Sequence, residues 1–107
     1  MENKPICNVD LIGNKKWTLN GIFHREDGPA IEYTNGDKEW YINGKPHRLD
    51  GPAIIYGNGL VNWCVNGYSI MNKIEKWSHE NGIDLFNLTD VDKALIKIVW
   101  SDYVPET

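Results

Sequence analysis

Short runs of alternating apolar and polar residues occupy the chain as far as residue 67. Trp40 and Ile42, for example, fall on one side of such a run and Tyr41 on the other, as side chains do in a strand. Asn-Gly pairs separate the runs: Asn20-Gly21, Asn35-Gly36, Asn43-Gly44, Asn58-Gly59 and Asn66-Gly67. Both residues of such a pair tolerate positive φ, as tight type I′ hairpin turns require. The pattern therefore predicts a series of antiparallel hairpins.

This hairpin pattern repeats with a period of 23 residues. Trp17, Trp40 and Trp63 are spaced by 23 positions, and the units beginning at Trp17 and Trp40 are identical at 13 of 23 positions. Each full unit also holds an Asp-Gly-Pro turn, at residues 27–29 and 50–52. Because repeated units stack on their neighbours, residues 13–67 are predicted to form an antiparallel β-meander that advances by one hairpin per repeat.

The pattern becomes helical after the last Asn-Gly pair. A first apolar stripe at helical spacing consists of Ile70, Met71, Ile74 and Trp77. Ser69 precedes this stripe as an expected N-cap, and Asn81-Gly82 follows it as an expected helix end.

A second helix is predicted from Thr89 or Asp90, with Asp90 and Asp92 near its positive end. Its apolar face consists of Val91, Leu95, Ile98 and Val99, which follow one another at i, i+4, i+7 and i+8. We expect the two helices, within residues 69–104, to cover an open edge of the sheet with their apolar sides. A helix pair that docks a partner is the alternative.

The chain is therefore predicted to be one α+β domain, residues 1–107, in which a β-meander of repeated hairpins is capped by two C-terminal helices. Its net charge is −4. Sequence-independent binding of nucleic acid needs a surplus of lysine and arginine, so bulk nucleic acid is disfavoured as a partner. No stretch approaches the ~20 apolar residues of a membrane span, and no signal peptide is present, so we expect a cytoplasmic protein.

The string Trp-x-x-Asn-Gly-x-x-His-Arg-x-Asp-Gly-Pro-Ala, present from Trp17 and again from Trp40, resembles the MORN-variant repeats common in tailed bacteriophages, giant viruses and some bacteria. The likeness covers residues 13–67. The stretch Gly82–Lys93 is similar, more loosely, to the tails of small accessory proteins of large tailed phages. The resemblance implies a hairpin-repeat fold and, for the phage proteins, action on a host protein in the host cytoplasm.

The repeated His-Arg-x-Asp motif supplies the candidate binding residues. They are His24, Arg25, Asp27, His47, Arg48 and Asp50, together with Trp17 and Trp40 of the aromatic ladder. Arginine offers a planar fork of donors for phosphate or carboxylate, and aromatic rings can stack on nucleobases. Two structural interpretations stand beside this one. Each arginine can pair with the aspartate of its own repeat and hold the Gly-Pro turn, and the tryptophans can pack as core beneath the helices.

Catalysis and metal binding find little support in the sequence. No nucleophile elbow, phosphate loop or dinucleotide fingerprint occurs, so an enzyme is not expected. Equivalent residues of successive hairpins lie roughly 9–10 Å apart, too far for His24 and His47 to share one zinc ion at about 2 Å. Cys7 and Cys64 are read as reduced thiols, although a single bridge between them is the alternative. No cofactor or metal is predicted.

Three hypotheses for function follow. The first is a non-catalytic binding protein, a phage or viral accessory factor that binds and modulates a host protein. The second is a protein that sequesters a nucleotide-type signal and so counters host defence. The third is a structural subunit that self-associates, as a homo-oligomer, through a sheet edge.

Overall fold

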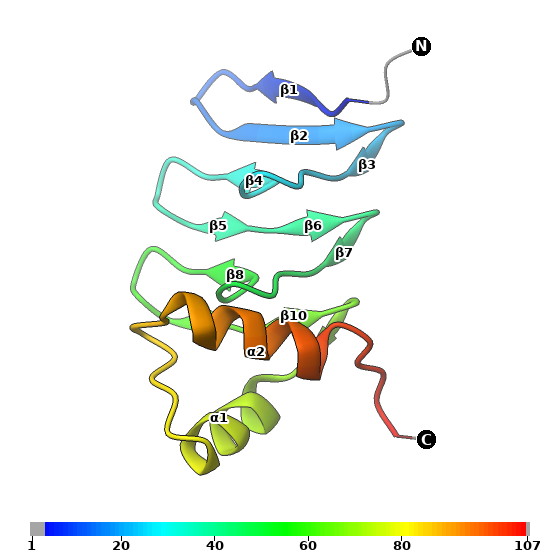
Figure 1. Cartoon of the computed structure of the whole chain (residues 1–107). Coiled ribbons are helices and arrows are strands. Elements are labelled where there is room, and N and C mark those ends of the chain that lie inside the picture. The colour runs from blue at the N-terminus through cyan, green and yellow to red at the C-terminus, as the bar shows by residue number, and fades with distance from the viewer. Residues whose placement is uncertain (1–3, 107) are drawn as a thin grey trace.

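The computed structural model describes residues 4–106 and has an α+β fold (Figure 1). Its strands are β1 (Ile6–Val9), β2 (Lys15–Leu19), β3 (Ile22–Phe23), β4 (Ile31–Glu32), β5 (Lys38–Glu39), β6 (Tyr41–Ile42), β7 (Lys45–Pro46), β8 (Ile54–Ile55), β9 (Val61–Asn62), β10 (Cys64–Val65) and β11 (Tyr68–Ser69). A 7-stranded antiparallel sheet has the order β1-β2-β4-β5-β8-β9, with β3 on β2. The hairpins follow one another down the molecule in Figure 1, so the predicted meander of repeated hairpins is confirmed.

Two kinds of turn alternate along the meander. Asn20, Asn43 and Asn66 have φ of 54°, 52° and 55°, and the glycine after each is also positive, as a type I′ turn requires. In the turns at residues 34–36 and 57–59, which the structure describes in full, only Gly36 and Gly59 have a positive φ. Tyr33 N–H donates to Asp37 O at 2.9 Å, which closes a three-residue loop with Gly36 in the left-handed position. Two of the five Asn-Gly pairs therefore make this wider turn, and their prediction as type I′ turns is wrong.

Backbone hydrogen bonds close each unit and join it to the next. Trp17 N–H donates to Ala30 O and Trp40 N–H to Ala53 O, both at 2.7 Å. Between units, Gly44 N–H donates to Phe23 O at 2.8 Å. The Asn-Gly turn of one unit is thus hydrogen-bonded to the strand of the unit before it, which fixes the spacing of the repeat.

Helix α1 spans Met71–Glu80 and helix α2 spans Asp90–Trp100. The N-cap of α1 is Ile70, which makes no side-chain capping bond, whereas Ser69 lies in β11 and its hydroxyl donates to Asn62 Oδ1. The prediction of Ser69 as the cap is therefore wrong, because the last hairpin continues through Ser69. Asn81 follows α1 as its C-cap, as predicted. In α2, Thr89 and Asp92 form a capping box, so the choice between Thr89 and Asp90 is resolved for Thr89.

Both helices pack against the last hairpin, β10–β11, which follows the β9 end of the sheet (Figure 1). The core consists of Trp63, Val65, Ile70, Ile74, Ile96 and Trp100. Of the tryptophan ladder, only Trp63 belongs to this core, while Trp17 and Trp40 are half-buried farther along the sheet. The interpretation of the whole ladder as core beneath the helices is therefore wrong, because the two short helices bury only the last of the three tryptophans.

The apolar face predicted for α2 points to solvent. Val91 and Ile98 are 77% and 79% exposed, and Leu95 and Val99 are also exposed. The helix instead buries Ile96 and Trp100, which are four residues apart. Trp100 decides this orientation, since its ring packs edge-on against Trp77 of α1 with centroids 6.0 Å apart. The predicted face is thus wrong as a core face, and it forms an apolar surface.

Candidate functional site

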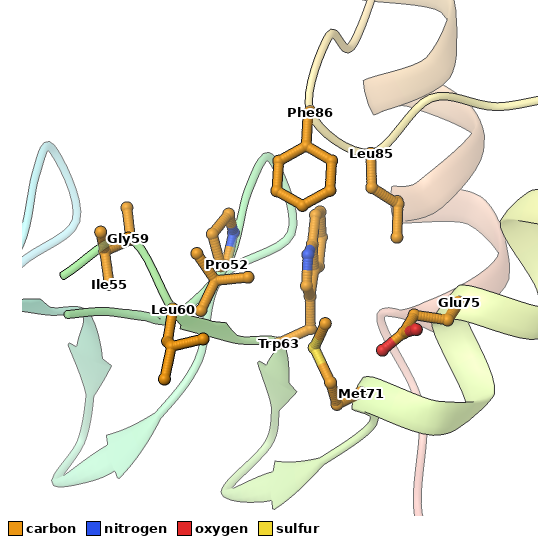
Figure 2. A pocket seen from close by; sticks show the side chains of 10 residues that line it. Pro52, Ile55, Gly59, Leu60, Trp63, Met71, Glu75, Leu85 and Phe86 are labelled. Atoms are coloured by element: carbon orange, nitrogen blue, oxygen red, sulfur yellow. The ribbon is translucent and has the colours of Figure 1, made fainter.

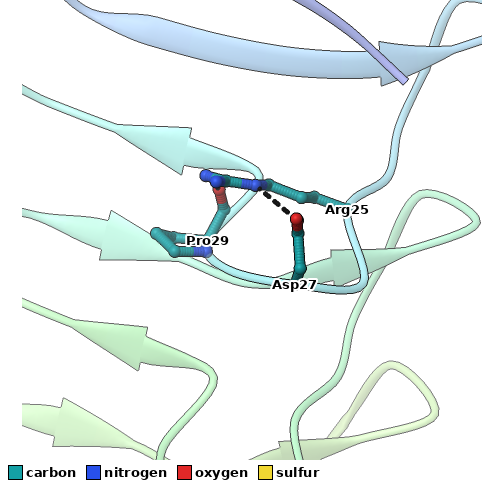
Figure 3. A network of polar contacts seen from close by, with 3 residues as sticks. All are labelled: Arg25, Asp27 and Pro29. Atoms are coloured by element: carbon teal, nitrogen blue, oxygen red, sulfur yellow. Dashed lines mark hydrogen bonds and ion pairs between the residues drawn. The ribbon is translucent and has the colours of Figure 1, made fainter. Parts of the chain in front are cut away.

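Each His-Arg-x-Asp motif folds back on its own repeat. In the first unit, Arg25 Nε donates to Asp27 Oδ1 at 2.9 Å and Nη1 donates to Pro29 O at 3.0 Å (Figure 3). The guanidinium carbon lies 3.8 Å from the ring centroid of Trp17. The arginine therefore ties the Asp-Gly-Pro turn to the tryptophan of the same unit by a charge-assisted hydrogen bond and a cation–π contact.

The second unit has the same geometry. Arg48 Nε donates to Asp50 Oδ1 at 2.8 Å, Nη1 donates to Pro52 O at 3.1 Å, and the guanidinium lies 3.9 Å from the Trp40 centroid. Gly51 also lies close to the guanidinium. A Cβ at this position would come within 2.7 Å of the Arg48 Cζ. The guanidinium thus has little free space beside it, and a side chain at the glycine of the turn would displace it.

These contacts leave the arginines poorly placed for an external anion. Their side chains are only 21% and 22% exposed, and each is neutralised by the carboxylate of its own repeat. The pKa of Asp50 lies below its usual value. Partial burial raises this pKa, but the hydrogen bond and the charge of Arg48 lower it by a larger amount. The carboxylate is therefore ionised at neutral pH and remains a permanent partner of Arg48.

The histidines connect one repeat to the next. His24 is buried, and its Nδ1 accepts a hydrogen bond from Asn43 N–H at 3.0 Å. His47 Nδ1 accepts from Asn66 N–H at 2.9 Å. Both acceptors serve the Asn-Gly turn of the following unit, whose backbone is in the left-handed region. The histidines must be unprotonated at Nδ1 for this role.

Burial lowers the pKa of His47 below the ordinary value of a histidine. The unfolded chain therefore takes up a proton at a higher pH than the folded chain does. The stabilisation by neutral His47 should be complete above the unfolded pKa and lost as the pH falls through the folded pKa. We expect the free energy of unfolding to decline between about pH 7.5 and 5.5. Urea denaturation at several pH values within that range measures this decline.

The variant His47→Asn is the matched control, because an amide oxygen can accept the same hydrogen bond and does not titrate. Its free energy of unfolding should vary less with pH than that of the wild type. An equal decline in both proteins would assign the pH dependence to other groups.

Six of the eight candidate residues border one surface hollow of about 410 Å³. They are Arg25, Asp27, Trp40, His47, Arg48 and Asp50, and they are joined there by Glu26 and by Lys97 of α2. The charged side chains of this hollow balance, with three cations and three carboxylates. The other two candidates, Trp17 and His24, border a neighbouring hollow that also contains Lys4. The structure thus brings the two motifs together in a hollow that has no excess of positive charge.

Cys7 and Cys64 are both free thiols, the first exposed on β1 and the second buried on β10. Burial raises the pKa of the Cys64 thiol, which keeps it protonated at neutral pH. Among residues 4–106, no group of three or more histidines, cysteines and carboxylates is placed to hold a metal ion. Neither helix in that part of the chain is long and apolar enough to cross a membrane.

An apolar surface without a partner in the fold lies on the helical end. Phe86, in the linker between the helices, is also uncovered, with 85% of its side chain exposed. Sequence reasoning found the α2 residues through their spacing but assigned them to the core. It did not single out Phe86, whose position beyond the regular helix gives no periodic signal.

No protein-family model, curated protein or solved structure matches this chain. The fold and the site together define a hairpin-repeat α+β protein. The polar groups of its His-Arg-x-Asp motifs bond to other groups of the repeats, and its helical end carries an apolar surface.

Proposed function

We propose that this chain is a non-catalytic binding protein that uses the outer face of α2 to dock a protein partner. The observation that carries the proposal is the exposure of Val91, Leu95, Ile98 and Val99 on one side of that helix. Contiguous exposed apolar surface on a small protein is typical of protein–protein contact sites. Residues spaced at i, i+4, i+7 and i+8 are also the pattern by which one helix lies in an apolar groove of another protein.

The partner that fits this surface is a protein with an apolar groove. The acidic residues Asp90 and Asp92 stand at the start of α2, and Lys93 and Lys97 follow, so the rim around the apolar side chains is charged with both signs. In line with the resemblance to phage accessory proteins, we propose that the partner is a host protein which this chain modulates. The hypothesis of a sequestered nucleotide receives less support, because Arg25 and Arg48 are already paired within their repeats.

The experiment that tests this function compares two matched variants. Ile98→Glu places a charge in the centre of the α2 face, whereas Leu11→Glu makes the same kind of change at the fully exposed turn after β1. Bacterial lysate is passed over each immobilised protein, and the captured proteins are quantified against the wild type. Each protein captured through α2 should fall at least about tenfold with Ile98→Glu and remain with Leu11→Glu.

Both variants change exposed side chains, so both should unfold at the wild-type urea concentration. Captured proteins that are the same for wild type and Ile98→Glu would contradict the use of α2. Loss of capture with Leu11→Glu alone would assign the contact surface to the opposite end of the sheet.

A further inference from the structure

A cavity of about 530 Å³ lies beside the helical end and away from the α2 face. It is open to solvent on one side and bordered by the β8–β9 turn, the first turns of α1 and the linker that contains Leu85 and Phe86. Figure 2 shows Phe86 and Leu85 extending from the linker toward Trp63, while Met71 and Glu75 approach it from α1. Its volume lies within the range of ligand sites for small molecules.

The lining is apolar apart from one carboxylate. Apolar side chains come from the sheet, from α1 and from the linker, and Glu75 is the single ionisable residue among them. Within residues 4–106, no ion pair or hydrogen bond engages the Glu75 carboxylate. The pattern of an apolar cavity with one polar group that fixes orientation is typical of small-molecule sites.

Two large side chains at the rim are uncovered. Phe86 is 85% exposed and Leu60, on the opposite side in the β8–β9 turn, is 66% exposed. An occupant that lies between them would remove both from water. The unpaired carboxylate sets the charge of that occupant, since a cation is attracted there and an anion is repelled.

We propose that this cavity binds a small molecule that carries an aromatic or aliphatic body and a single ammonium group. The apolar body lies between Phe86 and Leu60, above the buried ring of Trp63, and the ammonium group pairs with Glu75. This site is independent of the proposed protein partner, because none of the four exposed residues of the α2 face lines it.

The test uses three probes with the same ring and different charge: 2-(1-naphthyl)ethylamine, 1-ethylnaphthalene and 1-naphthylacetate. Binding is followed by nuclear magnetic resonance of the ¹⁵N-labelled protein, in which the Trp63 indole N–H reports on the cavity. We expect saturable shifts for the amine at roughly millimolar concentration or below, weaker shifts for the uncharged compound and none for the carboxylate. The shifts should be confined to Trp63, Leu60, Glu75 and Phe86.

Two variants of one exposed residue separate charge from shape. Glu75→Gln should weaken binding of the amine about threefold, as expected for an exposed ion pair, and leave the uncharged probe unchanged. Glu75→Lys should reverse the order, so that the carboxylate binds better than the amine. Glu80→Gln, on the same helix but outside the cavity, should leave all three affinities unchanged.

Several outcomes would overturn the proposal. They are the absence of saturable shifts for the amine, equal binding of amine and carboxylate, and no change of preference with Glu75→Lys. Shifts spread equally over the α2 face would show general adhesion of an apolar compound. Binding only of peptides that join an aromatic residue to a lysine would assign the cavity to a protein interface.

Discussion

Trp63→Ala is expected to lower the free energy of unfolding by about 3–5 kcal/mol. Trp63 is 1% exposed and is the largest side chain buried completely in the core. Its ring lies where the last hairpin meets both helices, so truncation removes apolar contacts and leaves a cavity that these short elements cannot easily fill. Urea denaturation followed by far-ultraviolet circular dichroism measures the loss. If the alanine variant does not fold, Trp63→Phe provides a milder change whose free energy can be measured.

The matched control for this prediction is the same substitution at an earlier repeat. Trp17 occupies the equivalent position, but it is half-buried and its ring contacts Arg25 instead of the helices. We expect Trp17→Ala to cost clearly less than Trp63→Ala, at about 1–3 kcal/mol. Equal losses at the two positions would mean that the helices contribute little to the core.

The repeat explains why the sheet could be predicted from the sequence. Two copies of a 23-residue unit, each with an Asn-Gly pair after a tryptophan, leave few arrangements other than stacked hairpins. The turn at Asn35-Gly36 shows the limit of this reasoning. An Asn-Gly pair allows a type I′ turn, but the hydrogen bond between Tyr33 and Asp37 selects a loop one residue longer. Loop length depends on strand register, which the dipeptide alone does not contain.

The orientation of α2 could not be predicted, because apolar residues lie on more than one side of that helix. Residues 94–100 contain a single charged residue, Lys97, so periodicity favours several faces almost equally. The contact between Trp77 and Trp100 selects one of them, and it joins residues from two helices. A tertiary contact of this kind leaves no trace in the local pattern.

The roles of the motif residues were partly predictable. The ion pair between Arg25 and Asp27 lies within one repeat, so the sequence could offer it as an alternative to ligand binding. The bond from Asn43 N–H to His24 Nδ1 crosses from one repeat to the next and depends on the geometry of stacking. The sequence therefore suggested the histidines as ligand-binding residues. In the structure they accept hydrogen bonds from the turns of the following units.

Arg48→Ala is expected to lower the free energy of unfolding by about 2 kcal/mol. The substitution removes the stacking on Trp40 and leaves the carbonyl of Pro52 without its donor. The bond to Asp50 adds little to this loss, because that carboxylate is 53% exposed. A structural role thus predicts a change in stability, whereas a nucleotide site predicts nearly unchanged unfolding and lost binding. Urea denaturation and nucleotide titration of the same protein distinguish these two roles.

Two further variants make the Arg48 prediction specific to geometry. Arg48→Lys keeps the charge but has no planar fork, so it should recover only a small part of the lost stability. Gly51→Ala keeps the arginine but places a Cβ within 2.7 Å of its Cζ, which should displace the guanidinium from Trp40. Because both changes disrupt one contact, the double variant Arg48→Ala/Gly51→Ala should lose less stability than the two single losses combined. Additive losses would mean that Gly51 does not act through Arg48. Full recovery by lysine would mean that Arg48 acts as a general positive charge, which is the property an anion site would need.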